Sequence, residues 1–201
     1  PVGAPPIHTS HGDQAGRLIA GRFEIVREIG RGGVGLVYQA TQKTMNRAVA
    51  VKVLTPDNHR DGDARERFRR EAAAVSRLKN PHTVSVFDFG EDETGELFLV
   101  MELLEGLPLS RVLSARGPLA AAEVTEIAGQ ILDSLLEAHA AAILHRDLKP
   151  DNVFVLANPG NSIFVKVLDF GLARIMDETL DRRTFPGVVF GTPAYMSPEQ
   201  V

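Results

Sequence analysis

The sequence predicts an α+β fold of two lobes, in which a five-stranded antiparallel sheet holding one helix precedes a mostly helical region. Three observations support this architecture. Five short segments within residues 23–101 have the alternating or Val-rich composition of strands. Between the third and fourth of them, residues 63–78 instead space their apolar side chains three and four positions apart, which is typical of an amphipathic helix. Beyond Gly106 the helical spacing dominates.

The individual elements follow from these patterns. Residues 1–21 are rich in Pro, Gly, His and Ser, and we expect them to form a flexible leader. The five predicted strands are residues 23–29, 36–40, 47–54, 85–89 and 97–101. Two helices at 109–113 and 120–141 and two short strands at 153–156 and 165–168 follow. We therefore expect an N-lobe at 22–104 and part of a C-lobe at 105–201.

The composition excludes several classes of protein. The 201 residues are 44% apolar and 24% charged, which is ordinary for a globular domain. A net charge of −4 without clustered basic residues argues against a nucleic-acid partner. The absence of cysteine excludes disulfides and thiolate metal sites and fits a cytoplasmic location. The apolar runs are too short to span a bilayer, so we expect no membrane segment here, although the whole protein could be anchored by one elsewhere.

A glycine-rich turn between the first two predicted strands is a candidate phosphate site. Its G-x-G-x-x-G pattern comprises Gly30, Arg31, Gly32, Gly33, Val34 and Gly35. Glycines allow the backbone to bend over a phosphate and to present N–H groups without obstruction. A dinucleotide-binding turn would require a helix directly afterwards, whereas a strand follows here. The turn is therefore either a flap over phosphates or a plain glycine-rich hairpin.

Lys52, on the third predicted strand, is a candidate phosphate ligand. An ammonium group beside triphosphate oxygens must be held in place, and a carboxylate partner can hold it. Glu71, on the following helix, is the partner that the helical phase favours, since it lies one turn before the inward-facing Val75. The alternatives are a solvated strand-edge lysine and one more charge on an exposed helix face.

The string HRDLKPDN at residues 145–152, followed by Asp-Phe-Gly at 169–171, is the strongest signal in the sequence. Asp147 is placed to accept the proton of an attacking hydroxyl, and Lys149 to neutralise charge on a transferring phosphoryl group. Asn152 and Asp169 offer an amide oxygen and a carboxylate, hard ligands suited to Mg²⁺. Each residue alone could cap a turn or stabilise a loop, but the combined string is not explained in that way.

These motifs, in this order, resemble the eukaryotic-type (Hanks-type) protein kinase family. The string GTPAYMSPEQ at 191–200 and the pattern GGxGxVY at 32–38 resemble its bacterial serine/threonine branch. The resemblance implies a kinase-like two-lobe fold, ATP and Mg²⁺ as cofactors, and transfer of the γ-phosphoryl group to Ser or Thr of protein substrates. Self-association for trans-autophosphorylation is a further partner that it suggests.

By the same resemblance, further residues would contact the nucleotide or align the lobes. Leu36 would continue the flap, Met101 would be the gatekeeper beside the adenine, and Glu102 and Leu104 would offer hinge backbone groups. The residues expected above and below the adenine are Ile29, Val37, Ala50 and Phe154. The residues expected to stack as an apolar spine are Val75, Val86, His145 and Phe170.

The segment after Gly171 resembles an activation segment. A phosphate on Thr184, or on the competing Thr179, could pair with Arg146 and order the segment, whereas Thr192 would position Asp147 and Lys149. The alternative is that these threonines are ordinary loop residues.

Two departures from the family pattern bear on stability and activity. Ala142 stands where the bacterial branch often has glycine, so a positive φ there would add strain of about 1 kcal/mol. The sequence also stops before the further helices of such kinases. We therefore expect exposed apolar faces on the long helix and little activity from these 201 residues alone.

Two other functions compete with the protein kinase interpretation. A non-catalytic nucleotide-binding or scaffold module would share the fold, but such modules usually lack one of the four residues Lys52, Asp147, Asn152 and Asp169. A small-molecule phosphotransferase of related fold is disfavoured by residues 191–200, which resemble a protein-substrate platform.

Overall fold

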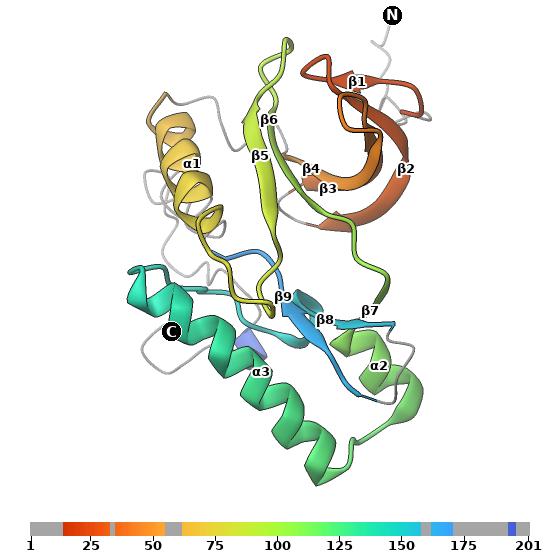
Figure 1. Ribbon diagram of the computed structural model, residues 1–201, viewed down its shortest axis with the longest axis vertical. Coiled ribbons are helices and arrows are strands. Elements are labelled where there is room, and N and C mark those ends of the chain that lie inside the picture. Colours follow the sequence, from red (N-terminus) through yellow and green to blue (C-terminus); the bar gives the residue numbers. More distant parts are fainter. Residues whose placement is uncertain (1–13, 33–34, 55–61, 158–161, 171–192, 196–201) are drawn as a thin grey trace, which may run out of the picture.

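The computed structural model shown in Figure 1 describes residues 14–32, 35–54, 62–157, 162–170 and 193–195. The N-lobe is a curled, antiparallel six-stranded sheet in the order β1-β2-β3-β4-β6-β5, with helix α1 beside β5. Its elements are β1 (Leu18–Ile19), β2 (Phe23–Gly32), β3 (Gly35–Gln42), β4 (Arg47–Leu54), α1 (Gly62–Val75), β5 (Val86–Glu91) and β6 (Leu97–Glu102). The C-lobe contains β7 (Gly106–Pro108), α2 (Leu109–Arg116), α3 (Ala121–Ala140), β8 (Val153–Leu156) and β9 (Val165–Val167), with 3-10 turns at Pro150–Asn152 and Pro193–Tyr195. The five predicted N-lobe strands are all present, and β1 and β7 were not predicted.

Strand β1 corrects the expected extent of the leader. Ile19 pairs with Phe23 of β2 and is 1% exposed, and the Gly16 N–H donates to the Ile25 carbonyl at 2.8 Å. The Arg17 guanidinium donates to Asp92 at 3.0 Å, on the turn between β5 and β6. Residues 14–21 are thus part of the N-lobe. A two-residue strand is too short to show the alternation that identifies strands in a sequence.

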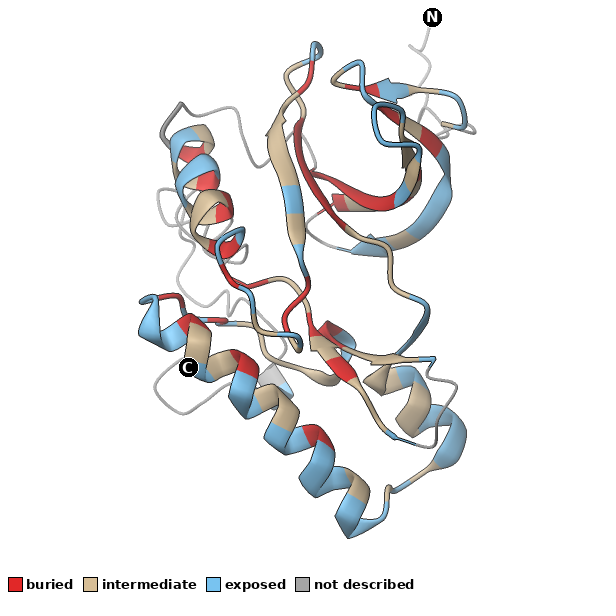
Figure 2. Ribbon diagram, viewed as in Figure 1, coloured by how far each residue is buried: buried red, intermediate tan, exposed pale blue. Residues whose placement is uncertain are grey.

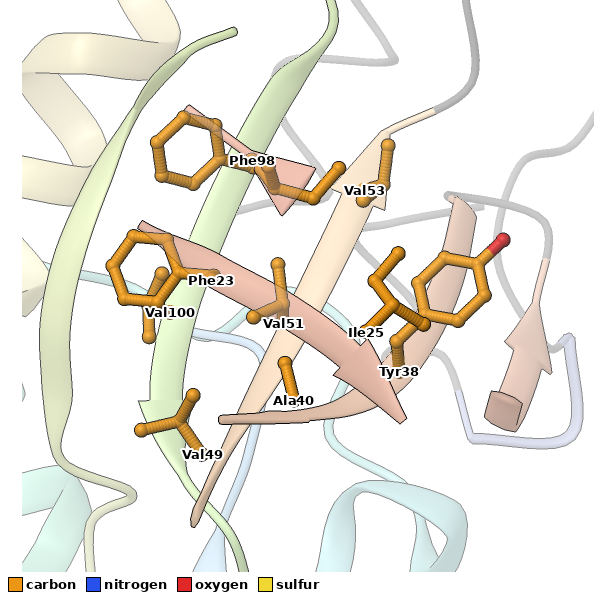
Figure 3. Close-up of a cluster of buried hydrophobic side chains, with 10 residues drawn as sticks. Phe23, Ile25, Tyr38, Ala40, Val49, Val51, Val53, Phe98 and Val100 are labelled. Atoms are coloured by element: carbon orange, nitrogen blue, oxygen red, sulfur yellow. The ribbon is translucent and has the colours of Figure 1, made fainter. Parts of the chain in front are cut away.

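The two faces of the sheet bury different clusters. Alternation along β4 places Val49, Val51 and Val53 on the concave face shown in Figure 3, where they pack with side chains of β2, β3 and β6. Ala50 and Leu54 face the other way, towards α1. Lys52 has the same phase as these two residues because side chains two apart in a strand share a face. The strand therefore directs one lysine between the sheet and α1.

Helix α1 packs on the sheet through the apolar residues that its spacing predicted. Phe68 and Ala72 are completely buried, and Val75 is 6% exposed. The Phe68 and Phe89 rings meet edge to face with centroids 6.5 Å apart, a favourable geometry for two aromatic rings. The helical prediction for this segment is confirmed, although the helix ends at Val75, three residues before its predicted end.

Helix α3 is only partly covered. The apolar spacing of residues 120–141 places Val124, Ile127, Ile131, Leu135 and Leu136 on one face of the helix. Ile127 is buried against β9 and its neighbours, and so is Ala138, which was not assigned to that face. In contrast, Val124 and Leu136 are 51% and 68% exposed. Figure 2 shows the resulting long exposed strip on this helix. An apolar strip of this kind favours association between molecules.

The segment at 79–85, between α1 and β5, is hydrogen-bonded to the C-lobe. The Lys79 and Asn80 N–H groups donate to the Glu137 carboxylate at 2.8 and 2.7 Å. The buried Thr83 and Ser134 hydroxyls are 2.7 Å apart, and the Val84 N–H donates to the Val167 carbonyl at 3.0 Å. These bonds satisfy backbone groups that burial would otherwise leave unpaired.

The C-terminus of α3 is closed by a Schellman motif with an alanine in the left-handed position. The Ile143 N–H donates to the Ala138 carbonyl at 2.8 Å and the Ala142 N–H to the His139 carbonyl at 2.9 Å. Ala142 has φ +58°, a conformation in which glycine is preferred because its Cβ is missing. The positive φ is the condition under which we expected strain from an alanine at this position.

We therefore expect Ala142→Gly to raise the free energy of unfolding by about 1 kcal/mol, because relief of the left-handed strain exceeds the added chain entropy. The Cβ of Ala142 lines a cavity, so its removal forfeits little packing. Urea unfolding measures the difference. Ala141→Gly is the matched control: Ala141 has φ −89°, so glycine there should destabilise the protein. If both substitutions change the free energy of unfolding in the same direction, the strain argument is wrong.

Candidate active site

The loop after α3, residues 145–152, brings together the predicted catalytic side chains of Asp147 and Lys149 and the predicted metal ligand Asn152. The Lys149 ammonium lies 2.8 Å from Asp147 Oδ2. The Asn152 amide donates to the Asp147 carbonyl at 2.8 Å and to Asp147 Oδ2 at 3.2 Å. The loop thus fixes the Asp147 carboxylate by contacts to both its backbone and its side chain. A carboxylate held in this way can accept a proton from a hydroxyl presented at its open side, since 28% of its side-chain surface is exposed.

Lys52 and Asp169 form the second part of the site. The Lys52 ammonium lies 2.8 Å from Asp169 Oδ1, and Lys52 is 5% exposed as a residue. Asp169 has φ +59°, in the left-handed region that few non-glycine residues adopt. The Leu168 N–H just before it donates to the Asn152 carbonyl at 2.8 Å, which joins this segment to the catalytic loop. Residues from β4, the end of β9 and the catalytic loop therefore converge on one place.

The expected partner of Lys52 differs from the observed one. Within the described residues, the ion pair of Lys52 is with Asp169, not with Glu71. Helix α1 approaches Asp169 through Ala72 and Val75, which share a small cavity with it. Glu71 instead lines a cavity of about 260 Å³ between α1 and the end of α3, which Arg146 also lines. Since the ion pair of Lys52 is with Asp169, Lys52 does not hold α1 through Glu71 in this state.

A buried pair of rings, His145 and Phe170, lies next to the site. His145 and Phe170 have ring centroids 4.8 Å apart, and Phe170 packs in one cluster with Val75 and Val86. His145 Nε2 lies 2.8 Å from the Leu168 carbonyl oxygen, which assigns the ring proton to Nε2. The four residues expected in the spine are thus neighbours, linked through Phe170.

Burial lowers the pKa of His145 below its ordinary value of 6.5, against the opposing effect of its bond to Leu168. The unfolded chain then binds more protons than the folded one below that pH. Neutral His145 makes its whole contribution to the free energy of unfolding above pH 6.5. This contribution is lost as the pH falls towards the lower pKa of the folded state. We expect the free energy of unfolding to decrease from pH 7 to 5, and His145→Gln to flatten this dependence. An unchanged slope in His145→Gln would contradict the assignment.

Most of the residues expected around adenine gather on the face of the sheet next to α1. Ala50 and Met101 are opposite each other in the β4–β6 pair and are 5% and 7% exposed. Val37 and Leu104 pack against the same cluster. Ile29 lies on β2 and is 38% exposed.

The flap is a hairpin between antiparallel strands, as predicted. Gly32 pairs with Gly35, while Gly33 and Val34 lie outside the described residues. A Cβ on Gly35 would meet the Val53 carbonyl oxygen at 2.1 Å, so only glycine fits this close approach.

Two flap side chains are directed away from the expected nucleotide position. The Leu36 side chain packs on the concave face of the sheet, whereas Val37 packs on the other face, because successive strand residues point to opposite faces. Only its backbone can line a site next to α1. Arg31 donates to the Glu28 carboxylate at 3.1 and 3.0 Å on the surface. These two residues were expected among the nucleotide contacts, and for Leu36 the expectation ignored the strand alternation.

The proposed metal ligands fit a magnesium ion chemically. Asn152 directs its amide nitrogen to Asp147, which leaves its Oδ1 on the other side, and Asp169 supplies a carboxylate. Among the described residues there is no group of three or more His, Asp or Glu side chains suited to a metal. Two oxygen ligands are nevertheless the usual protein contribution for Mg²⁺, which keeps several waters and binds phosphate oxygens.

Several predicted features lie outside the described residues. They are Gly171, Thr179, Thr184, Thr192 and the residues from 196 to 201. No helix in the described part of the chain has the length and apolar character needed to cross a membrane.

Lys166 is a residue of this region that was not identified from the sequence. Its ammonium lies 2.7 Å from a carboxylate oxygen of Glu102, at the end of β6. The available signal was the alternation of residues 165–167, in which one lysine stands between two valines that are completely buried. Such a lysine must lie on the face opposite the core.

Comparison with known proteins gives consistent matches. The sequence matches the protein kinase domain family over residues 23–201. It is similar to the serine/threonine-protein kinase pkn3 of Myxococcus xanthus, with 44% identity over 190 residues, covering 94% of this chain and 35% of that protein. It is 40% identical over 185 residues to the serine/threonine-protein kinase PrkC of Bacillus subtilis, covering 92% and 28% of the two chains. The chain thus spans about a third of the length of these curated relatives.

The fold has solved counterparts as well. The crystal structure of the PknI kinase domain of Mycobacterium tuberculosis superposes with a TM-score of 0.70 and 30% identity, covering 82% of this chain and 68% of that one. The fold is therefore the two-lobe kinase fold, and the convergence of Lys52, Asp147, Asn152 and Asp169 occurs within it. The chain belongs to the protein kinase domain family.

Proposed function

We propose that the protein transfers the γ-phosphoryl group of ATP to Ser and Thr hydroxyls of protein substrates. The observation that carries this proposal is the convergence of two charge pairs, Lys52–Asp169 and Lys149–Asp147, on segments joined by the Leu168–Asn152 hydrogen bond. The names of the two curated relatives support the Ser/Thr specificity.

The proposed roles follow from the positions of the side chains. Asp147 accepts the proton of the substrate hydroxyl while the hydroxyl oxygen forms a bond to the γ-phosphorus. The bond between that phosphorus and the β–γ bridging oxygen breaks, and ADP is released. The Lys149 ammonium, 2.8 Å from Asp147, neutralises charge on the transferring group. Lys52 exchanges its contact with Asp169 for phosphate oxygens when the nucleotide binds.

Asn152 and Asp169 would hold Mg²⁺, which supplies positive charge to the phosphates when it is bound. The backbone of the flap would cover the phosphates. The adenine would lie between Ile29, Val37 and Ala50 on one side and Phe154 on the other. Met101 would lie beside it, with the backbones of Glu102 and Leu104 at its edge.

Regulation by the segment after Gly171 is a further part of the proposal. A phosphate on Thr184 or Thr179 would bind Arg146, which lines the cavity beside α1 together with Arg70 and Glu71. Filling that cavity would bias α1, which Lys52 does not hold through Glu71 in this state. Transfer between two copies of the protein would supply the phosphate, and the use of ATP implies a cytoplasmic location.

Incubation of the whole protein with ATP labelled at the γ-phosphate tests the proposal, since we expect little activity from these 201 residues alone. We expect label on protein, recovered as phosphoserine and phosphothreonine after acid hydrolysis. ATP labelled at the α-phosphate is the control and should leave the protein unlabelled. Label only on tyrosine would contradict the specificity. Nucleotide binding without any transfer would favour a scaffold module, and label only on a small molecule a different phosphotransferase.

A further inference from the structure

Lys166 lies at the junction of the lobes with most of its side chain covered. Its neighbours in β9, Val165 and Val167, are completely buried in the C-lobe core. Lys166 therefore points to the opposite face, where it stands directly across from Phe154 in the β8–β9 pair. Directly opposed residues of an antiparallel pair have their Cβ atoms about 5 Å apart. The side chain is 12% exposed, so this is not an ordinary solvated lysine.

The partner of Lys166 is the carboxylate of Glu102. Glu102 Oε1 accepts a bond from the Lys166 ammonium at 2.7 Å and one from the Ser85 N–H at 2.7 Å. The Glu102 N–H in turn donates to the Ser85 carbonyl at 3.0 Å. Lys166 also donates to the Thr83 carbonyl at 3.2 Å. One ammonium thus joins β9, the end of β6 and the segment at 79–85.

Unlike a surface salt bridge, this arrangement can fix the position of the Glu102 side chain. Exposed ion pairs contribute little because water and salt compete for both partners. Here the Glu102 side chain is 24% exposed and has a backbone donor as well as the lysine, so its position is fixed from two sides. Charge-assisted hydrogen bonds of this kind are shorter and stronger than neutral ones.

We propose that Lys166 is a positioning residue for adenine binding. It fixes Glu102, and through it the backbone from Met101 to Leu104, at a set distance from Phe154. This inference rests on the proposed function, in which that backbone meets the adenine edge and Phe154 its lower face. The lysine acts on both surfaces at once, since it is bonded to one and adjacent to the other. It touches no reacting atom.

Lys166→Met tests the proposal because it keeps the length of the side chain and removes the charge. We expect the Kd values of adenosine and ATP to rise by the same factor, about fivefold. The affinity for inorganic triphosphate and the transfer rate at saturating ATP should stay unchanged. Lys166→Arg should restore adenosine affinity. Glu102→Met, which removes the acceptor of the Lys166 bond, should raise the adenosine Kd by the same factor, and the double variant should lose no more affinity than either single one.

Lys43→Met is the matched control. Lys43 lies in the turn after β3, with a 54% exposed side chain 3.4 Å from Glu24. Its replacement should change none of these affinities. Unchanged adenosine affinity in Lys166→Met, or an equal loss for adenosine and triphosphate with a lowered unfolding temperature, would overturn the inference. Failure of the proposed function is a separate result, because the wild-type protein would then bind adenosine without transferring phosphate.

Discussion

Asp147→Asn should lower the rate of phosphoryl transfer at saturating ATP by about a thousandfold, with little change in nucleotide affinity. Asparagine has the shape of aspartate but cannot accept the proton of the attacking hydroxyl. Its side-chain oxygen can still accept the bond from Lys149, which in the wild type spans 2.8 Å, so the loop should keep its fold. The measurement is single-turnover transfer of labelled phosphate, which separates chemistry from binding.

Asp151→Asn is the matched control for this substitution. Asp151 belongs to the same loop but is exposed, and its carboxylate accepts a bond from the Ser110 hydroxyl at 2.9 Å. An asparagine oxygen can accept the same bond, so most of the wild-type rate should remain. Equal labelling by the wild type and Asp147→Asn would remove Asp147 from its proposed role.

Lys52→Met and Asp169→Asn should both reduce transfer by about 10²–10³-fold, yet differ in their effect on stability. Asp169→Asn leaves a buried ammonium beside a neutral amide, which should cost about 1–3 kcal/mol of the free energy of unfolding. Asparagine tolerates the left-handed backbone at this position, so the charge is the main change. Lys52→Met leaves a carboxylate whose side chain is 30% exposed and can be hydrated, so its cost should be smaller.

Urea unfolding of the two variants and of the double variant measures these costs. The double variant should be more stable than Asp169→Asn alone, because no uncompensated charge remains. A larger loss for Lys52→Met than for Asp169→Asn would contradict this expectation, because the greater cost would then lie with the more exposed carboxylate and not with the buried ammonium.

The sequence was informative wherever the structure of a segment depends on residues only a few positions apart. The alternation of β4, the helical phase of α1 and the expected strain at Ala142 concern neighbours within a few positions, and the structure agrees with each. The catalytic loop was recognisable for the same reason, since Asp147, Lys149 and Asn152 lie within six consecutive residues.

Long-range choices between similar partners were not predictable. From the sequence we paired Lys52 with Glu71, whereas the structure pairs it with Asp169, 117 positions away. The bond from Lys166 to Glu102 joins residues 64 apart, and nothing local to either residue indicates the other. The two-residue strand β1 was missed because its pairing with β2, not its own pattern, makes it a strand.

The bonds of the segment at 79–85 also determine which parts of the molecule can move together. Although this segment precedes β5 in the chain, Glu137 and Val167 hold its first residues to the C-lobe. A rotation of the sheet relative to α3 that keeps these bonds would leave residues 79–84 with the C-lobe. The amide protons of Val84 and Val167 should consequently exchange with solvent at the slow rate of the C-lobe core, even when the two lobes separate.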